Sequence, residues 1–108
     1  MSLDATPIEL WIEWRQRPRA AVVVPYVRAA DDALIDYEVQ IGRKGGSGAV
    51  EVRQSGDTRL QADVPRALGE VLIEREPGDT CTVFLRIKPR GTPPPRPVER
   101  SFACPRAR

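Results

Sequence analysis

The chain has 108 residues, the size of one domain with a single hydrophobic core. Hydrophobic residues make up 41% and charged residues 30%, a balance typical of globular proteins and not of disordered chains. No apolar run approaches the roughly 20 residues of a membrane-spanning helix, so no membrane partner is expected. We expect one β-sandwich domain over residues 8–104, preceded by a flexible leader at 1–7 and followed by a basic tail at 105–108.

Short runs with β-type patterning follow one another at a spacing of roughly 8–12 residues. In residues 8–14, apolar side chains alternate with Glu9 and Glu13, which predicts a strand with one buried face. A second strand is expected at 20–27, where Pro25 indicates either an edge or a bulge because proline cannot donate to a ladder. Residues 34–43 show the cleanest alternation and predict a third strand.

The second half of the chain continues this pattern. A glycine-rich hairpin is expected at 44–48, followed by a strand at 50–53 that Gly56 and Asp57 bring to an end. A short extended piece at 60–64 and a stiff, polyproline-like loop at 89–97 are also expected. The remaining strands are predicted at 68–74, 80–88 and 98–104. About seven strands and no convincing helix predict an all-β antiparallel sandwich.

The residue types present argue against an enzyme. The chain has no histidine, which removes the commonest general base and the usual zinc ligand. The serines therefore lack an activating base, and the adjacent Asp31 and Asp32 are explained by a turn. Two cysteines are too few for a structural zinc site. We expect no catalytic activity, no cofactor and no metal.

The two cysteines, Cys81 and Cys104, either pair or remain two buried thiols. If the last two strands form a hairpin around the proline-rich loop, Cys81 faces Cys104 in the register that sets Arg86 opposite Glu99. The same register places Arg100 opposite Leu85.

The C-terminal fifth of the chain is basic, although the net charge is only +2. From residue 86 onward a single acid, Glu99, stands against seven basic residues: Arg86, Lys88, Arg90, Arg96, Arg100, Arg106 and Arg108. Such an excess indicates an anionic or acidic partner, or simply a solvated strand and tail. If Trp11 and Trp14 stack on bases and the basic segment binds phosphates, the chain is a small nucleic-acid-binding domain. Against this alternative, no basic strand carries interleaved aromatic residues.

The order of features between residues 37 and 88 resembles the CsgC/CsgH family of periplasmic curli amyloid inhibitors. The resemblance rests on Val39-Gln40-Ile41 before a Gly-Ser-Gly hairpin at 46–48, on a leucine-bearing connection at 68–73, and on Pro77-Gly78-Asp79 before the alternating strand at 81–87. The C-x-C pair of some members falls on Ile35 and Tyr37 here, so no redox role is carried over.

The resemblance implies an immunoglobulin-like fold and a monomeric periplasmic protein that binds an unfolded curli-type subunit and delays its nucleation. An oxidising compartment, together with the hairpin register, predicts a Cys81–Cys104 disulfide. Weak binding of a polar, flexible chain favours long-range charge attraction. The expected partner-binding residues are Arg86, Lys88, Arg90 and Arg100, followed by Arg43, Lys44 and Arg53.

Two further expectations concern the surroundings of these cations. Antiparallel pairing of strands 34–43 and 80–88 places Arg43 and Lys44 beside Glu76 and Asp79, whereas Arg90 and Arg96 are expected to have fewer acidic neighbours. The alternative function within the same fold is that of an adhesion or pilus-type sandwich that binds a protein by strand addition, which requires an open sheet edge.

Overall fold

The computed structural model describes residues 7–46, 48–74, 76–93 and 95–105. The predicted leader up to residue 6, Ser47 of the hairpin, Pro94 of the proline-rich loop and the tail from 106 lie outside the described residues. The strands are β1 (Ile8–Arg17), β2 (Ala20–Ala29), β3 (Ala33–Gly45), β4 (Gly48–Leu60), β5 (Arg66–Ala67), β6 (Val71–Glu74), β7 (Thr80–Pro89) and β8 (Val98–Ala103). No helix that could span a membrane occurs in this part of the chain.

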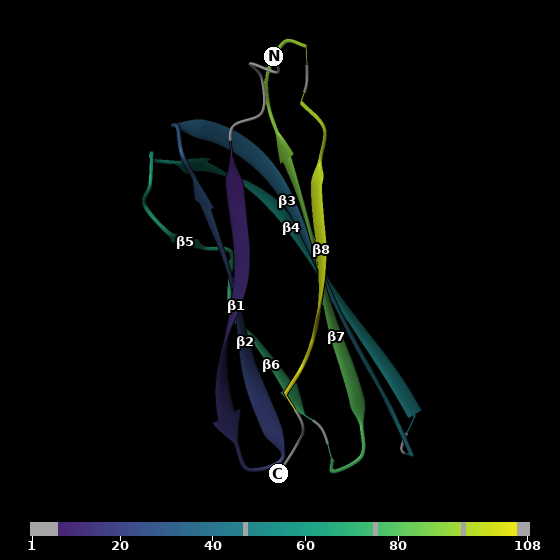
Figure 1. The fold of residues 1–108 in the computed structure, drawn as a ribbon. Coiled ribbons are helices and arrows are strands. Elements are labelled where there is room, and N and C mark those ends of the chain that lie inside the picture. Colours follow the sequence, from purple (N-terminus) through teal and green to yellow (C-terminus); the bar gives the residue numbers. More distant parts are fainter. Residues whose placement is uncertain (1–6, 47, 75, 94, 106–108) are drawn as a thin grey trace.

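The strands form two antiparallel sheets that pack face to face (Figure 1). Sheet A has β2 in its centre, with β1 on one side and the short β5 and β6 on the other. Sheet B has the order β4-β3-β7-β8. The molecule is elongated, about 48 Å along its longest axis. The predicted antiparallel β-sandwich is therefore confirmed.

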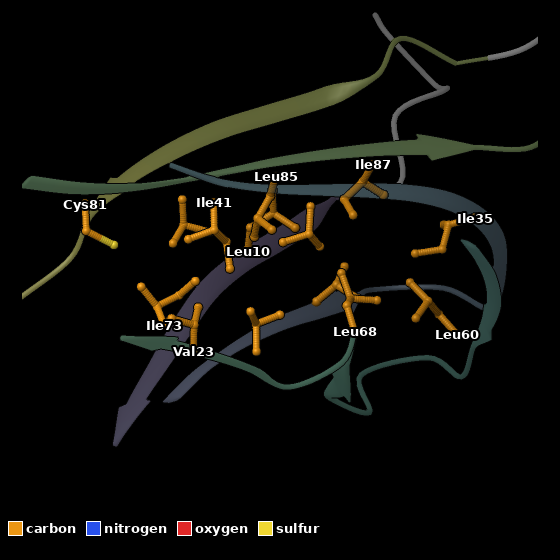
Figure 2. Packing of buried hydrophobic residues seen from close by; sticks show 14 of the residues in the cluster. Leu10, Val23, Ile35, Ile41, Leu60, Leu68, Ile73, Cys81, Leu85 and Ile87 are labelled. Atoms are coloured by element: carbon orange, nitrogen blue, oxygen red, sulfur yellow. The ribbon is translucent and has the colours of Figure 1, made fainter. Parts of the chain in front are cut away.

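Alternating apolar side chains of both sheets fill the space between them (Figure 2). Val83, Leu85 and Ile87 of β7 are fully buried, as are Ile35 of β3 and Val27 of β2. The alternation in the sequence assigned the named positions of β3 and β7 to the interior, but it made no such prediction for Val27. β-Branched and leucine side chains suit this role because they pack closely on a pleated surface.

Pro25 lies at an irregularity of sheet A, as the sequence predicted. β6 pairs with residues 20–23 of β2, and β5 pairs with residues 26–27 in a register shifted by one residue. Pro25 falls between the two ladders, where its missing N–H is not required. Its carbonyl accepts a hydrogen bond from the amide of Leu68 at 2.8 Å. Of the strand predicted at 68–74, only residues 71–74 form a strand, β6, and β5 lies before the predicted range at residues 66–67.

β4 is much longer than the sequence indicated. The strand continues through Gly56 and Asp57, where an end was expected, and pairs with β3 over all its 13 residues. Tyr37 lies directly opposite Gly56. A Cβ at position 56 would lie only 2.8 Å from the Tyr37 hydroxyl, so the absence of a side chain there leaves room for the tyrosine ring to pack over the strand. The extended piece predicted at 60–64 is also wrong, because residues 61–65 form turns that lead to sheet A.

The hairpin of β7 and β8 has the predicted register. Arg86 lies opposite Glu99 and Leu85 opposite Arg100. At its end the amide of Cys104 donates to the carbonyl of Cys81 at 3.0 Å, and the two cysteines form a disulfide with a Cα–Cα distance of 5.2 Å. The bond ties the end of the chain's last strand to the core strand β7.

Candidate functional site

The outward-facing side chains of sheet B form a surface that we call the charged face. Their orientation follows from the register, because each of them alternates with a buried residue on the same strand or lies opposite an outward-facing neighbour. Among the described residues this face has six basic and five acidic side chains: Lys44, Arg53, Arg59, Arg86, Lys88 and Arg90 against Asp36, Glu38, Glu51, Asp57 and Glu99. The face is therefore mixed in charge, and it is not the basic patch that residue counting from 86 onward suggested.

A hollow of about 480 Å³ lies on the charged face over strands β4, β3 and β7. Its charged lining consists of Asp36, Glu38 and Asp57 on one side and Arg86 and Lys88 on the other. Such a hollow offers both donors and acceptors of strong hydrogen bonds to a polar chain.

Arg90 lies beside the hollow and joins two of the acids that line it. Its Nη2 lies 2.7 Å from Oδ1 of Asp36 and 2.8 Å from Oδ2 of Asp57. These two carboxylates face each other across β3 and β4, where like charges would repel without the guanidinium between them. The hydrogen bond from Arg90 lowers the pKa of Asp36, and the same contact raises the pKa of Arg90. The expectation that Arg90 has few acidic neighbours is wrong.

Arg86 and Lys88 differ in how far they are already neutralised. Nε of Arg86 is 3.5 Å from Oε1 of Glu99, close enough for attraction but without hydrogen-bond geometry. Lys88 is exposed and lies opposite Asp36, yet it forms no ion pair within the described part of the chain. Lys88 is therefore the cation of the hollow that is most available to an anionic group.

Two of the predicted binding residues do not belong to the charged face. Arg43 points to the inner side of sheet B and pairs with Asp79 at 3.1 Å, with only 15% of its side chain exposed. The predicted contact between Arg43 and this acid is thereby confirmed. Arg100 also lies on the inner side, where it stacks over Phe102 at 5.3 Å and donates to the carbonyl of Leu10 at 3.5 Å.

The remaining predicted residues lie on the charged face away from the hollow. Arg53 pairs with Glu51 on its own strand at 2.7 Å, and Lys44 is exposed near the hairpin end of β3. A second hollow of about 340 Å³ includes Lys44 and Glu51. The seven predicted cations therefore do not converge on one site, and the structure brings together Arg86, Lys88 and Arg90.

The acids of the hollow were not among the binding residues predicted from the sequence, which were all cations. Asp36 and Glu38 alternate with buried residues of β3, which was a sufficient signal to place them outward beside Arg86 and Lys88. Asp57 could not be found in this way because it was assigned to a turn. No group of residues able to hold a metal ion occurs in the described ranges.

The aromatic residues do not support a nucleic-acid surface at this place. Trp11 stacks on Tyr26 with ring centroids 5.5 Å apart, and both rings lie on sheet A. Trp14 packs half-buried against the core. A stacking platform for bases would need such rings among the cations, whereas here they lie on the other sheet.

No protein-family model and no curated protein matches the sequence. Two solved structures are similar over nearly their whole length. The E. coli curli protein CsgC, in a form described as SeCys, has a TM-score of 0.76 and 18% identity, covering 89% of this chain and 98% of its own. The solution structure of R. palustris CsgH has a TM-score of 0.72 and 12% identity, covering 90% of this chain and 92% of its own. The chain has the fold that CsgC and CsgH share.

Proposed function

We propose that this protein binds an unfolded curli-type subunit and slows its amyloid nucleation, acting by association and without catalysis. The observation that carries the proposal is the fold, which matches CsgC and CsgH almost from end to end. The Cys81–Cys104 disulfide supports a periplasmic location, because such bonds persist in oxidising compartments.

The charged face supplies a physical mechanism. Mixed charges attract a polar, flexible chain over a distance and release it again, because exposed ion pairs contribute little net free energy. A subunit carboxylate can approach Lys88 without displacing an existing ion pair, whereas Arg86 and Arg90 must exchange or share their acids. Binding of this kind is weak and transient, which suits an inhibitor that acts on early aggregates.

The proposal is tested by following fibril formation of a purified curli subunit by thioflavin fluorescence, with and without the protein at substoichiometric ratios. The lag phase should lengthen with the protein present. Surface charges are screened beyond roughly 8–10 Å at physiological salt, so the lengthening should shrink as salt is added. A spectrum of the folded protein at each salt concentration serves as the control.

An unchanged lag phase at low salt, with the protein folded and its disulfide intact, would remove the proposed function. Inhibition that persists unchanged at high salt would support the proposed function but contradict the electrostatic mechanism. A single-stranded oligonucleotide that binds with a steep salt dependence would favour the nucleic-acid alternative instead.

A further inference from the structure

β4 is the long open edge of the described structure. The free edges of β1 and β8 lie beside each other, where Arg100 donates to the carbonyl of Leu10. The opposite edge of sheet A consists of β5 and β6, which have two and four residues. β4 has 13 residues and pairs on one side alone, with β3 (Figure 1). Long unpaired edges are templates for another strand.

The backbone groups that β4 presents at this edge can be assigned from the ladder. The amide of Arg90 donates to the carbonyl of Leu34 at 2.9 Å. The backbone amides and carbonyls of even-numbered β3 residues therefore point to β7, and those of odd-numbered residues point to β4. In the register of β3 and β4, odd-numbered residues of β3 lie opposite even-numbered residues of β4. The amides and carbonyls that point to the free edge therefore belong to Ala49, Glu51, Arg53, Ser55, Asp57 and Arg59.

The usual protections of a sheet edge are missing from β4. The strand has no proline, and its register with β3 is continuous, without a bulge. On its inward side it has no charge from residue 50 to 58, and Val50 is 46% exposed. Natural edges are kept from pairing by such prolines, bulges and inward charges. What remains is the row of charges on the outward side.

That row of charges is complementary to itself. It has the order Glu51, Arg53, Ser55, Asp57 and Arg59. When two copies run antiparallel about Ser55, Glu51 of each lies opposite Arg59 of the other and Arg53 opposite Asp57. A slip by one pair in either direction sets Glu51 opposite Asp57, or Arg53 opposite Arg59, which is unfavourable. One register is therefore selected.

We propose that the free edge of β4 is a homodimer interface in which two copies pair antiparallel about Ser55. Five facing pairs exchange about ten backbone hydrogen bonds in this arrangement, and sheet B continues across the two-fold axis. On the inner side, the same register sets the exposed Val50 of one copy opposite Leu60 of the other, which is already buried in its own core. The interface departs from the monomer expected from the sequence and does not depend on the proposed function.

Cross-linking tests the register directly. Facing residues with backbone hydrogen bonds lie about 5.5 Å apart at Cα, and the native Cys81–Cys104 pair shows that a disulfide spans such a site here at 5.2 Å. Under mild oxidation Ser55→Cys should give a covalent dimer, with a 55–55 linkage found by non-reducing peptide mapping. Ala49→Cys is the matched control, because two copies of residue 49 are separated by roughly 40 Å along the paired strands. Equal dimer yields from the two variants would contradict the register.

Sedimentation velocity at low salt tests the interface without cysteines. The wild-type protein should show a dimer whose fraction rises with concentration. Arg59→Glu should weaken this dimer at least about tenfold, because two like-charged pairs form by symmetry. The double variant Glu51→Arg/Arg59→Glu restores opposite charges and should regain most of the association.

A wild-type protein that stays monomeric up to millimolar concentration, with no excess cross-linking of Ser55→Cys, would overturn the proposal. Ser55→Pro adds a further readout, because the amide of residue 55 faces the free edge and is not part of the ladder with β3. If Ser55→Pro stays folded and loses inhibition of fibril formation while the wild type remains monomeric, the edge accepts the amyloid subunit and not a second copy.

Discussion

The two faces of sheet B have opposite roles although the same strands build both. On β7, Val83, Leu85 and Ile87 are fully buried, whereas the alternating Arg86 and Lys88 face water. Burial of the first set stabilises the fold through the hydrophobic effect, and the second set adds little to stability. Substitutions on one face should therefore leave the property of the other face nearly unchanged.

Arginine–aspartate pairs show the same contrast. On the inner side, the Arg43 and Asp79 side chains are 15% and 4% exposed, and Asp79 also accepts from the amide of Glu76. On the charged face, the side chains of Arg90 and Asp36 are both 48% exposed. The two pairs have the same chemistry. Removing one partner should be strongly destabilising only in the inner pair, because it leaves an unpaired charge in a mostly buried place.

The largest expected effect is on the inner face. Leu85→Ala removes a fully buried side chain from the centre of the core, which should destabilise the protein by about 3–4 kcal/mol in urea unfolding. Lys88→Ala, three residues away on the outer side, should change stability by less than about 0.5 kcal/mol. Comparable losses in the two variants would contradict the division between the faces.

The second-largest loss of stability is expected when the buried pair of Arg43 and Asp79 is broken. Asp79→Ala leaves the guanidinium of Arg43 without its acid in a mostly buried place, for an expected loss of about 3 kcal/mol. The matched variant on the charged face is Asp57→Ala, which leaves Arg90 in contact with Asp36 and should lose less than about 1 kcal/mol. The comparison needs only the urea midpoints of both variants. If Asp57→Ala proves the more destabilising, the contrast between the pairs is wrong.

The disulfide joins Cys81, an inner-face residue of β7, to Cys104, directly after β8, across a sequence separation of 23 residues. Closing a loop of this length stabilises the native state by about 3 kcal/mol. Replacing both cysteines by alanine should lower the unfolding midpoint accordingly, while the lag phase of subunit fibrillation should still lengthen at temperatures where the variant is folded. Loss of inhibition by a folded variant would instead give the disulfide a direct part in binding.

The smallest effect concerns Asp36. Its pKa is lowered from the ordinary value of 3.8, first by the hydrogen bond from Arg90 and also by attraction to Arg90 and Lys88. A carboxylate with a depressed folded pKa contributes stability above pH 3.8, and this contribution is lost as the pH falls through the folded pKa. Asp36→Asn should therefore be slightly less stable than wild type at pH 6, and this difference should shrink as the pH falls below 3.8. A constant difference between the two proteins across this range would argue against the ion pair.

The sequence was sufficient to predict which side chains are buried on strands where apolar and polar residues alternate. Ile35, Leu85 and the facing cysteines were placed correctly because a two-residue period and a hairpin register determine them locally. The length of β4 could not be predicted, since Gly56 is a turn residue by composition and becomes part of the strand only when Tyr37 packs against it. The charged face was therefore predicted with its cations and without Asp57, which reaches Arg90 through that longer strand.

The central claim is that charges of the hollow guide inhibition, and charge reversal there tests it most directly. The triple variant Arg86→Glu, Lys88→Glu and Arg90→Glu should remain folded, because these side chains face water, and at low salt it should lengthen the lag phase of subunit fibrillation much less than wild type does. A melting temperature measured on the same sample separates lost binding from lost stability. If the folded triple variant inhibits as well as wild type at low salt, the charged face is not the inhibitory surface.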